Sequence, residues 1–236
     1  MDERFIHSIF IDWTMIGADS YLRKIEALKG LKTLDFNSNV TFFVGENGSG
    51  KSTLLEAMAI ASGFNPEGGT KNYSFSTYDS HSELYDAIRV VRGSRKARWG
   101  YFLRAESFYN VATMEEQYAD QGHPSERYHE KSHGESFLAL AQNQLRPGGL
   151  YFFDEPEAAL SPQRQLTLLT EIYNCADGGS QFIIATHSPI LLGMPGAEIL
   201  TFDNGLIHTC EYEDTESYQV TEMFINDRKR LLDRLL

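Results

Sequence analysis

Several features are scarce in this sequence, and each scarcity excludes a class of protein. Only two cysteines, Cys175 and Cys210, occur among 236 residues. They make no disulfide framework, so a reducing cytosol is the default compartment. No apolar run approaches the ~20 residues that a transmembrane helix requires. The first residues, Met1 to Arg4, lack the charged-then-apolar layout of a signal peptide. We therefore expect a cytoplasmic chain with no membrane span.

Basic residues are also in the minority. The sequence has 21 Lys and Arg against 33 Asp and Glu, a formal net charge of −12. Nucleic-acid binding needs Lys and Arg at the contact surface, so the charge argues against binding over the whole surface but not against a local basic patch. The apolar content is ordinary for a globular chain, which makes disorder, collagen and a coiled-coil rod poor interpretations. The length fits one large domain or two small ones.

Strand-like and helix-like patterns alternate along the chain. Short apolar or aromatic runs bounded by glycine, proline or charge predict strands at Phe5–Ile11, Val40–Val44, Trp99–Leu103, Leu150–Phe153, Gln181–Ile184 and Glu198–Phe202. Helical patterns occupy Lys51–Ser62, Glu135–Leu145, Pro162–Tyr173 and Glu216–Leu235. This alternation predicts an α/β fold with a mostly parallel sheet flanked by helices.

Two segments interrupt the alternation. Asn65–Ser82 is rich in glycine and polar residues and is expected to be a loop, and Glu115–Lys131 is expected to be a mobile loop or a small helical insert. Between them, Ile88–Val91 and Trp99–Leu103 flank Gly93 and could form a hairpin, the small antiparallel part of the fold. We interpret residues 1–236 as one domain with an insert at about 64–133.

One motif decides the class of chemistry. The strand Val40–Val44 leads directly into Gly45-Glu46-Asn47-Gly48-Ser49-Gly50-Lys51-Ser52, followed by Thr53 and a helix. This is the full pattern of a phosphate-binding loop in its expected setting. The glycines let successive backbone N–H groups turn toward phosphate oxygens, and the helix N-terminus adds its positive end. Lys51 would reach the β- and γ-phosphates of ATP, and Ser52 would bind Mg²⁺.

A second motif supplies acidic residues. The apolar run Leu150–Phe153 ends in Asp154 and Glu155. A buried strand here would bring Asp154 beside the phosphate loop to hold Mg²⁺, and Glu155 would polarise a water that attacks the γ-phosphate. The alternative is an acidic pair that caps a helix at the strand end.

These motifs resemble those of ABC-type ATPases. Asp154-Glu155-Pro156-Glu157-Ala158-Ala159-Leu160-Ser161 resembles the family's Walker B segment and D-loop, and Lys131-Ser132-His133-Gly134-Glu135-Ser136 resembles its signature motif. His187, after the strand Gln181–Ile184, matches the family's switch histidine. The resemblance implies a P-loop NTPase fold in which Ser132 and Gly134 contact the γ-phosphate held by an opposite subunit, and the segment Ser132–Glu135 completes that subunit's ATP site.

The variant of each motif is most similar to the SMC and RecF-like branch, and to its small stand-alone ATPases. Gly45–Ala57 and the Asp-Glu-Pro-Glu run carry this similarity, and transporter cassettes usually have glutamine at the position of Glu135. One position departs from the family, because no glutamine follows Trp99–Leu103. Glu106 is a metal-ligand candidate there, or else an acid that favours a helix N-terminus.

Other side chains have two interpretations. His187 is either a γ-phosphate contact or a neutral imidazole satisfied by a backbone carbonyl. The histidines of the charged insert lack the partners of a metal site and are expected in a solvated loop. Residues 87–105 carry six basic residues and no acidic one, which fits either a nucleic-acid contact or Arg and Lys stems that cover apolar strands.

The motifs together predict Mg²⁺-dependent ATP hydrolysis by an ATPase in which two copies sandwich ATP. A DNA-associated role in genome maintenance or defence, with DNA or a protein as partner, is the first expectation for its output. The ATP-binding subunit of an ABC transporter is the alternative, and a regulatory module that scarcely hydrolyses ATP is a third. From the short interval between Lys51 and Ser132 we expect no long coiled-coil arms, and from the short stretch after His187 we expect no nuclease domain in this sequence.

Overall fold

The computed structural model describes residues 4–70, 82–105 and 133–236. Two sheets form its frame. The larger sheet has the strand order β5-β6-β7-β3-β8-β9, and the smaller has the order β2-β1-β4. The strands are β1 (Ile6–Ile11), β2 (Thr33–Asp35), β3 (Val40–Val44), β4 (Ile88–Arg92), β5 (Trp99–Arg104), β6 (Gly149–Asp154), β7 (Gln181–Ala185), β8 (Glu198–Thr201) and β9 (His208–Thr209).

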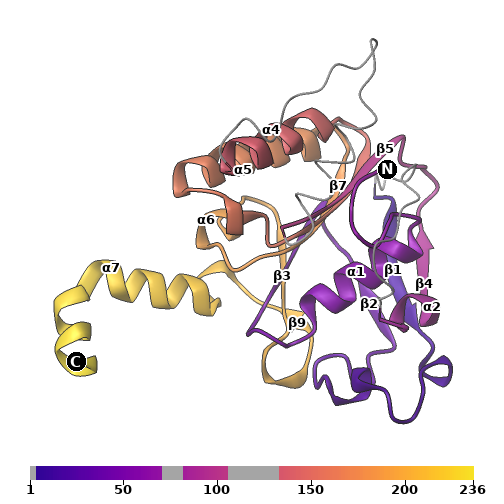
Figure 1. Ribbon diagram of the computed structural model, residues 1–236, viewed down its shortest axis with the longest axis horizontal. Coiled ribbons are helices and arrows are strands. Elements are labelled where there is room, and N and C mark those ends of the chain that lie inside the picture. Colours follow the sequence, from indigo (N-terminus) through magenta and orange to yellow (C-terminus); the bar gives the residue numbers. More distant parts are fainter. Residues whose placement is uncertain (1–3, 71–81, 106–132) are drawn as a thin grey trace.

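Helices cover both faces of the larger sheet (Figure 1). The helix that follows β3 lies on the side of the smaller sheet, and the two long helices before β6 and β7 lie on the other side. The α-helices are α1 (Lys51–Ala61), α2 (Leu84–Ala87), α4 (His133–Gln144), α5 (Pro162–Asp177), α6 (Pro189–Leu192) and α7 (Glu216–Leu235). The 3-10 helices are η1 (Trp13–Met15), η2 (Tyr21–Lys24), η4 (Pro156–Ala159), η5 (Asp203–Gly205) and η6 (Tyr212–Asp214).

The larger sheet is parallel apart from β9, which confirms the predicted α/β class. Its central strands β3, β6 and β7 are buried throughout, and alternate residues enter two separate hydrophobic cores. On β6, for example, Phe152 packs toward α1 and the smaller sheet, whereas Tyr151 and Phe153 pack toward α4 and α5. The sequence reads as continuous apolar runs because both faces of these strands are covered.

The hairpin prediction was wrong. β4 pairs antiparallel with β1, with Ile88 opposite Ile11, and belongs to the smaller sheet. β5 instead runs parallel to β6 at the edge of the larger sheet, with Arg104 opposite Asp154. The two segments are close in sequence, but each finds its hydrogen-bonding partner in a different strand from elsewhere in the chain. A small antiparallel part is present, and β1, not β5, is its central strand.

The C-terminal helix stands apart from the two cores. α7 projects away from the rest of the molecule (Figure 1) and none of its residues is buried. Its backbone leaves helical geometry at Asp227, with φ −138° and ψ 42°. Within the described ranges, no helix combines the length and the apolar character that crossing a membrane requires.

Candidate functional site

The loop between β3 and α1 requires glycine at two tightly packed positions. Gly45 has φ 137°, and a Cβ there would lie 2.8 Å from Asp203 Oδ1. Gly50 has φ 100°, and a Cβ there would lie 2.7 Å from Ile25 Cγ2. Side chains at these positions would be strained and would also clash. The glycines therefore allow both the curl of the loop and its close contact with neighbouring segments.

The N-terminus of α1 is left open. Gly50 is the N-cap residue of α1 and no side chain caps the helix, whereas Ser188 caps α6 and Thr215 caps α7 with their hydroxyl oxygens. The first backbone N–H groups of α1 therefore have no side-chain acceptor at the cap, and they carry the positive end of the helix dipole. This is the arrangement that binds phosphate groups.

Lys51 lies inside the loop. Its side chain is almost fully buried, and Nζ donates hydrogen bonds to the carbonyl oxygens of Gly45 at 2.7 Å and Glu46 at 2.8 Å. Burial lowers the pKa of Lys51, and the negative charge of Glu155, followed by that of Asp203, acts in the opposite direction. The ammonium group is thus fixed where the loop curls around it.

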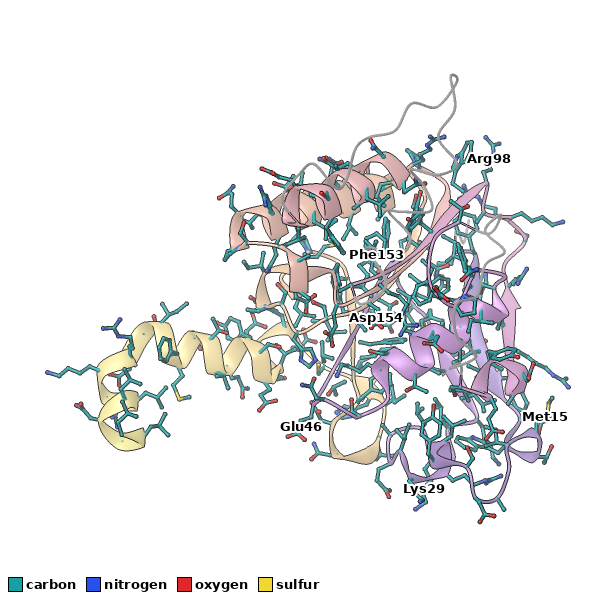
Figure 2. All side chains as sticks on the ribbon, viewed as in Figure 1. Met15, Lys29, Glu46, Arg98, Phe153 and Asp154 are labelled. Atoms are coloured by element: carbon teal, nitrogen blue, oxygen red, sulfur yellow. The ribbon has the colours of Figure 1, made fainter. Side chains whose placement is uncertain are left out.

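Two oxygen atoms meet beside the loop. Ser52 Oγ donates to Asp154 Oδ1 at 2.8 Å, because β6 ends next to the first turn of α1. Figure 2 shows Asp154 near that turn, and Glu46 in the loop that joins β3 to the helix. The described residues contain no group of three or more His, Cys, Asp and Glu side chains that could hold a metal ion. A hydroxyl and a carboxylate nevertheless fit Mg²⁺, which takes only one or two protein oxygens and completes its shell with phosphates and water.

Sequence reasoning missed a cation at the same strand edge. Arg104 ends β5 and lies opposite Asp154 in the parallel register. Its Nη1 is 2.6 Å from Glu56 Oε2 on α1, and its Nε is 3.9 Å from Asp154 Oδ2. In the sequence Arg104 is one of six basic residues within 87–105, which fit either a nucleic-acid contact or stems that cover apolar strands; its side chain is only 18% exposed. One signal could have identified Arg104: it directly follows a predicted strand, as Asp154 does, and the ends of neighbouring parallel strands lie close together.

Glu155 adopts a rare backbone conformation. Its φ of 49° and ψ of 52° are left-handed, and Asn204 is the other non-glycine residue with positive φ in the described part of the chain. Such a conformation costs about 1–3 kcal/mol and tends to occur at functional sites. The Glu155 N–H donates to the carbonyl of Ala185 at 2.9 Å, which ties the end of β6 to the end of β7.

His187 follows β7 at the same edge of the sheet. Its backbone N–H donates to Glu157 Oε1 at 2.6 Å. Its ring atom Nε2 is buried and has no hydrogen-bond partner among the described residues. The interpretation of His187 as an imidazole satisfied by a backbone carbonyl therefore finds no support at Nε2.

The signature-like segment lies on the other side of the larger sheet from α1. Gly134 and Glu135 begin α4, whose ribbon lies on the opposite face of the sheet from α1 (Figure 1). A Cβ at Gly134 would lie 2.6 Å from the carbonyl oxygen of Ala159. The exposed side chain of Glu135 accepts from Arg164 Nη2 at 2.9 Å. Two residues expected at the site, Ser132 and Glu106, lie outside the described residues.

A cavity of about 710 Å³ adjoins the phosphate loop. Its lining combines η2 and the segment after it, the loop, and the segment after β8: Tyr21, Lys24, Ile25, Glu26, Ala27, Glu46, Asn47, Gly48, Ser49, Phe202, Asp203, Asn204, Gly205 and Glu216. Asp203, also missed by sequence reasoning, accepts the backbone N–H of Glu46 at 2.9 Å and the hydroxyl of Thr201 at 2.9 Å. It anchors the first turn of the loop to the end of β8.

A loop that closes over Lys51, set between a parallel strand and a helix, defines a P-loop nucleotide-binding domain. A family model described as "AAA domain" matches residues 21–147, more than half of the chain. A second AAA-domain model matches residues 135–193. The chain therefore belongs to the AAA-domain family.

Curated relatives are longer proteins. The chain is 27% identical over 184 residues to the arabinose import ATP-binding protein AraG of Pseudomonas savastanoi pv. phaseolicola, covering 68% of this chain and 36% of AraG. It is 23% identical over 210 residues to the macrolide export ATP-binding/permease protein MacB of Bdellovibrio bacteriovorus, covering 80% of this chain and 31% of MacB. The chain thus spans about a third of the length of these relatives.

Solved structures resemble the fold at low identity. The SMC head domain from Thermotoga maritima is 15% identical with a TM-score of 0.46, covering 88% of this chain and 98% of that one. The protein cbiO1 from Clostridium perfringens, part of the ABC transporter complex cbiONQ, is 13% identical with a TM-score of 0.49, covering 98% of this chain and 99% of that one.

Proposed function

We propose that this chain binds Mg-ATP at Gly45–Thr53 and hydrolyses it. The observation that carries the proposal is the 2.8 Å contact between Ser52 Oγ and Asp154 Oδ1, at the open end of α1. It joins two oxygen ligands for Mg²⁺ to a loop that presents backbone N–H groups and a fixed ammonium. When bound, Mg²⁺ would neutralise charge on the β- and γ-phosphates.

Each residue has a proposed role in this reaction. The loop amides and Lys51 hold the phosphates, and Ser52 and Asp154 hold the metal. Glu155 accepts a proton from the attacking water, and the free Nε2 of His187 contacts the γ-phosphate. Phosphoryl transfer depends mainly on positioning and on charge stabilisation, which these groups supply. The cavity that adjoins the loop would take the nucleoside.

The proposal includes an ATP-dependent homodimer. The start of α4 lies on the opposite face of the larger sheet from α1 (Figure 1), so Gly134 and Glu135 would complete the site of a second copy. ATP would then stabilise the dimer, because the dimeric form would bind it more tightly than the monomer does.

Replacement of the proposed base tests this directly. Glu155→Gln should bind ATP, hydrolyse it at least about a hundredfold more slowly, and accumulate as a dimer. Light scattering with Mg-ATP should show the mass double. Glu171→Gln, the same change at a half-buried position of α5 where an amide oxygen can still accept from Gln142, should behave like the wild type. A Glu155→Gln protein that binds ATP but remains monomeric would contradict the sandwich.

A DNA-associated output is favoured by one surface feature. Five basic side chains on β4 and the β4–β5 connection are exposed: Arg89, Arg92, Arg95, Lys96 and Arg98. Figure 2 shows Arg98 well away from Asp154, so such a contact would not block the site. DNA should then raise the ATPase rate, and the stimulation should fall steeply as salt increases. A rate independent of DNA would remove this candidate.

A transporter subunit is the second candidate, and the similarity to AraG and MacB favours it. A membrane partner would be needed, because no described helix is long and apolar enough to cross a membrane. Co-purification of the tagged chain from detergent-solubilised membranes, dependent on ATP, would support this role. Recovery of the chain only from the soluble fraction would count against it.

A further inference from the structure

One half-buried carboxylate at the site has no role in the mechanism above. Glu157 lies in η4, two residues after Glu155, and its side-chain oxygen Oε2 is buried. Its Oε1 accepts the backbone N–H of His187 at 2.6 Å. This hydrogen bond joins the segment after β6 to the segment after β7, across thirty positions of the chain.

The placement of Glu157 is costly. A carboxylate withdrawn from water loses hydration, and that loss is recovered only if both oxygens find partners. Oε2 is buried and has no hydrogen-bond partner among the described residues. Burial raises the pKa of Glu157, whereas the hydrogen bonds from the His187 backbone and from the Thr186 hydroxyl act in the opposite direction. A buried polar group satisfied on one side only calls for an explanation beyond stability.

The neighbours of His187 are held by other elements. The Thr186 N–H donates to the carbonyl of Phe43 on β3 at 3.2 Å. The hydroxyl of Ser188 donates to Gln165 on α5 at 2.6 Å, and accepts from the N–H groups of the first turn of α6. The backbone of His187 is likewise held by another segment, because its N–H donates to Glu157, two residues after Glu155.

We propose that Glu157 is a positioning residue: by accepting the hydrogen bond from the His187 backbone, it holds His187 in register with Glu155 for reaction at the γ-phosphate. The inference rests on the proposed ATPase function. The two side chains must act on the same phosphate and water, and they come from different strands. A shift of one relative to the other of about 1 Å would slow the reaction about a hundredfold.

A competing role for Glu157 is that of a second proton acceptor. The two roles make opposite predictions for glutamine, because the amide oxygen of glutamine still accepts the His187 N–H but cannot take up a proton. Alanine removes both properties. Glu198 supplies a matched control at the opposite end of the sheet. It is also a half-buried carboxylate that accepts a backbone N–H, that of Asn37 at 2.9 Å.

The experiment compares steady-state ATP turnover of the full chain with Glu157→Ala, Glu157→Gln and Glu198→Ala. Glu157→Ala should lower kcat about ten- to a hundredfold and change KM by less than about threefold. Glu157→Gln should restore kcat to within about threefold of the wild type, and Glu198→Ala should leave it unchanged. Wild-type kcat in Glu157→Ala, or equal loss in both Glu157 variants, would overturn the proposal.

Amide hydrogen exchange tests the same hydrogen bond without ATP. The His187 amide should exchange at least about tenfold faster in Glu157→Ala than in the wild type, and at the wild-type rate in Glu157→Gln. Thermal unfolding of each variant shows whether the fold is kept. If the wild type hydrolyses no ATP, the proposed function fails, and exchange still decides whether Glu157 anchors His187. Equal exchange in all three proteins would overturn the anchor.

Discussion

The two ends of the larger sheet differ in how completely their buried polar side chains are hydrogen-bonded. At the amino ends of its strands, Gln181 is fully buried and both polar atoms of its amide are hydrogen-bonded: Oε1 accepts from Phe5 N and Ile6 N, and Nε2 donates to Ile6 O. Glu198 at that end uses both carboxylate oxygens on Asn37.

At the carboxyl ends the polar atoms are less completely satisfied. Ser49 Oγ, Glu157 Oε2 and His187 Nε2 are buried and have no hydrogen-bond partner among the described residues. Glu155 also has a strained backbone there. A folded protein normally pairs its buried polar groups, so several unpaired atoms at one end of the sheet favour a bound partner there; Ser62 Oγ, at the C-terminal end of α1, is another such atom outside the site. The comparison predicts that changes at the carboxyl end affect activity and that changes at the amino end affect stability.

The largest effect is expected at Lys51. Lys51→Ala removes the ammonium group that the loop encloses, and ATP turnover should fall at least about a hundredfold because charge on the phosphates loses its main fixed counter-charge. Coupled-enzyme assays of Mg-ATP hydrolysis measure this. Lys29→Ala makes the same change at an exposed lysine (Figure 2) whose ion pair with Glu26 contributes little, and should leave turnover unchanged. Undiminished turnover in Lys51→Ala would refute the phosphate-loop assignment.

Arg104 shares a feature with each end of the sheet. It lies at the carboxyl end, beside Asp154, but its side chain is paired, as the polar side chains at the amino end are. Arg104→Met leaves Glu56 with no ion pair and weakens the orientation of Asp154, so we expect a loss of about 3 kcal/mol in unfolding free energy. Urea denaturation measures it. Adding Glu56→Gln removes the second charge and should recover part of the loss, as coupled residues do in a double-mutant cycle. Simple additivity of the two changes would show that the ion pair contributes no coupling energy.

The parts of the site that are contiguous in sequence were predictable. β3 and α1 have the predicted limits to within one residue, because an apolar strand, a glycine-rich turn and a helix follow each other without interruption. The fold class followed from the same alternation of strands and helices. Ser52 and Asp154 were predicted as a metal pair, and the structure brings their oxygens within 2.8 Å.

Contacts between distant segments that no sequence motif marks were not predictable. β4 and β5 are neighbours in sequence, but β4 pairs with β1 and β5 pairs with β6. The sequence of the two segments does not show which distant strand each will pair with. The anchor between Glu157 and His187 joins two segments whose sequence patterns identify only loops after strands. Arg104 resembled the exposed basic residues around it, because charge alone does not reveal an inward-facing strand end.

The smallest effect on activity is expected from replacing Gln181, which lies at the amino end of the sheet. It was predicted only as the first residue of a strand, yet its amide joins β7 to the start of β1 and so links the two sheets. Gln181→Ala would leave the N–H groups of Phe5 and Ile6 buried without an acceptor, at a cost of about 1–3 kcal/mol.

The unfolding free energy should fall by that amount, while kcat for ATP in the folded protein should stay within about twofold. Gln163→Ala, on the exposed face of α5, should change neither quantity. The comparison between the two ends fails if Gln181→Ala lowers kcat as strongly as Glu157→Ala does at equal folded fraction. That result would mean that contacts at the amino end also hold the catalytic segments in place, because β7 carries Gln181 at its start and leads directly into His187.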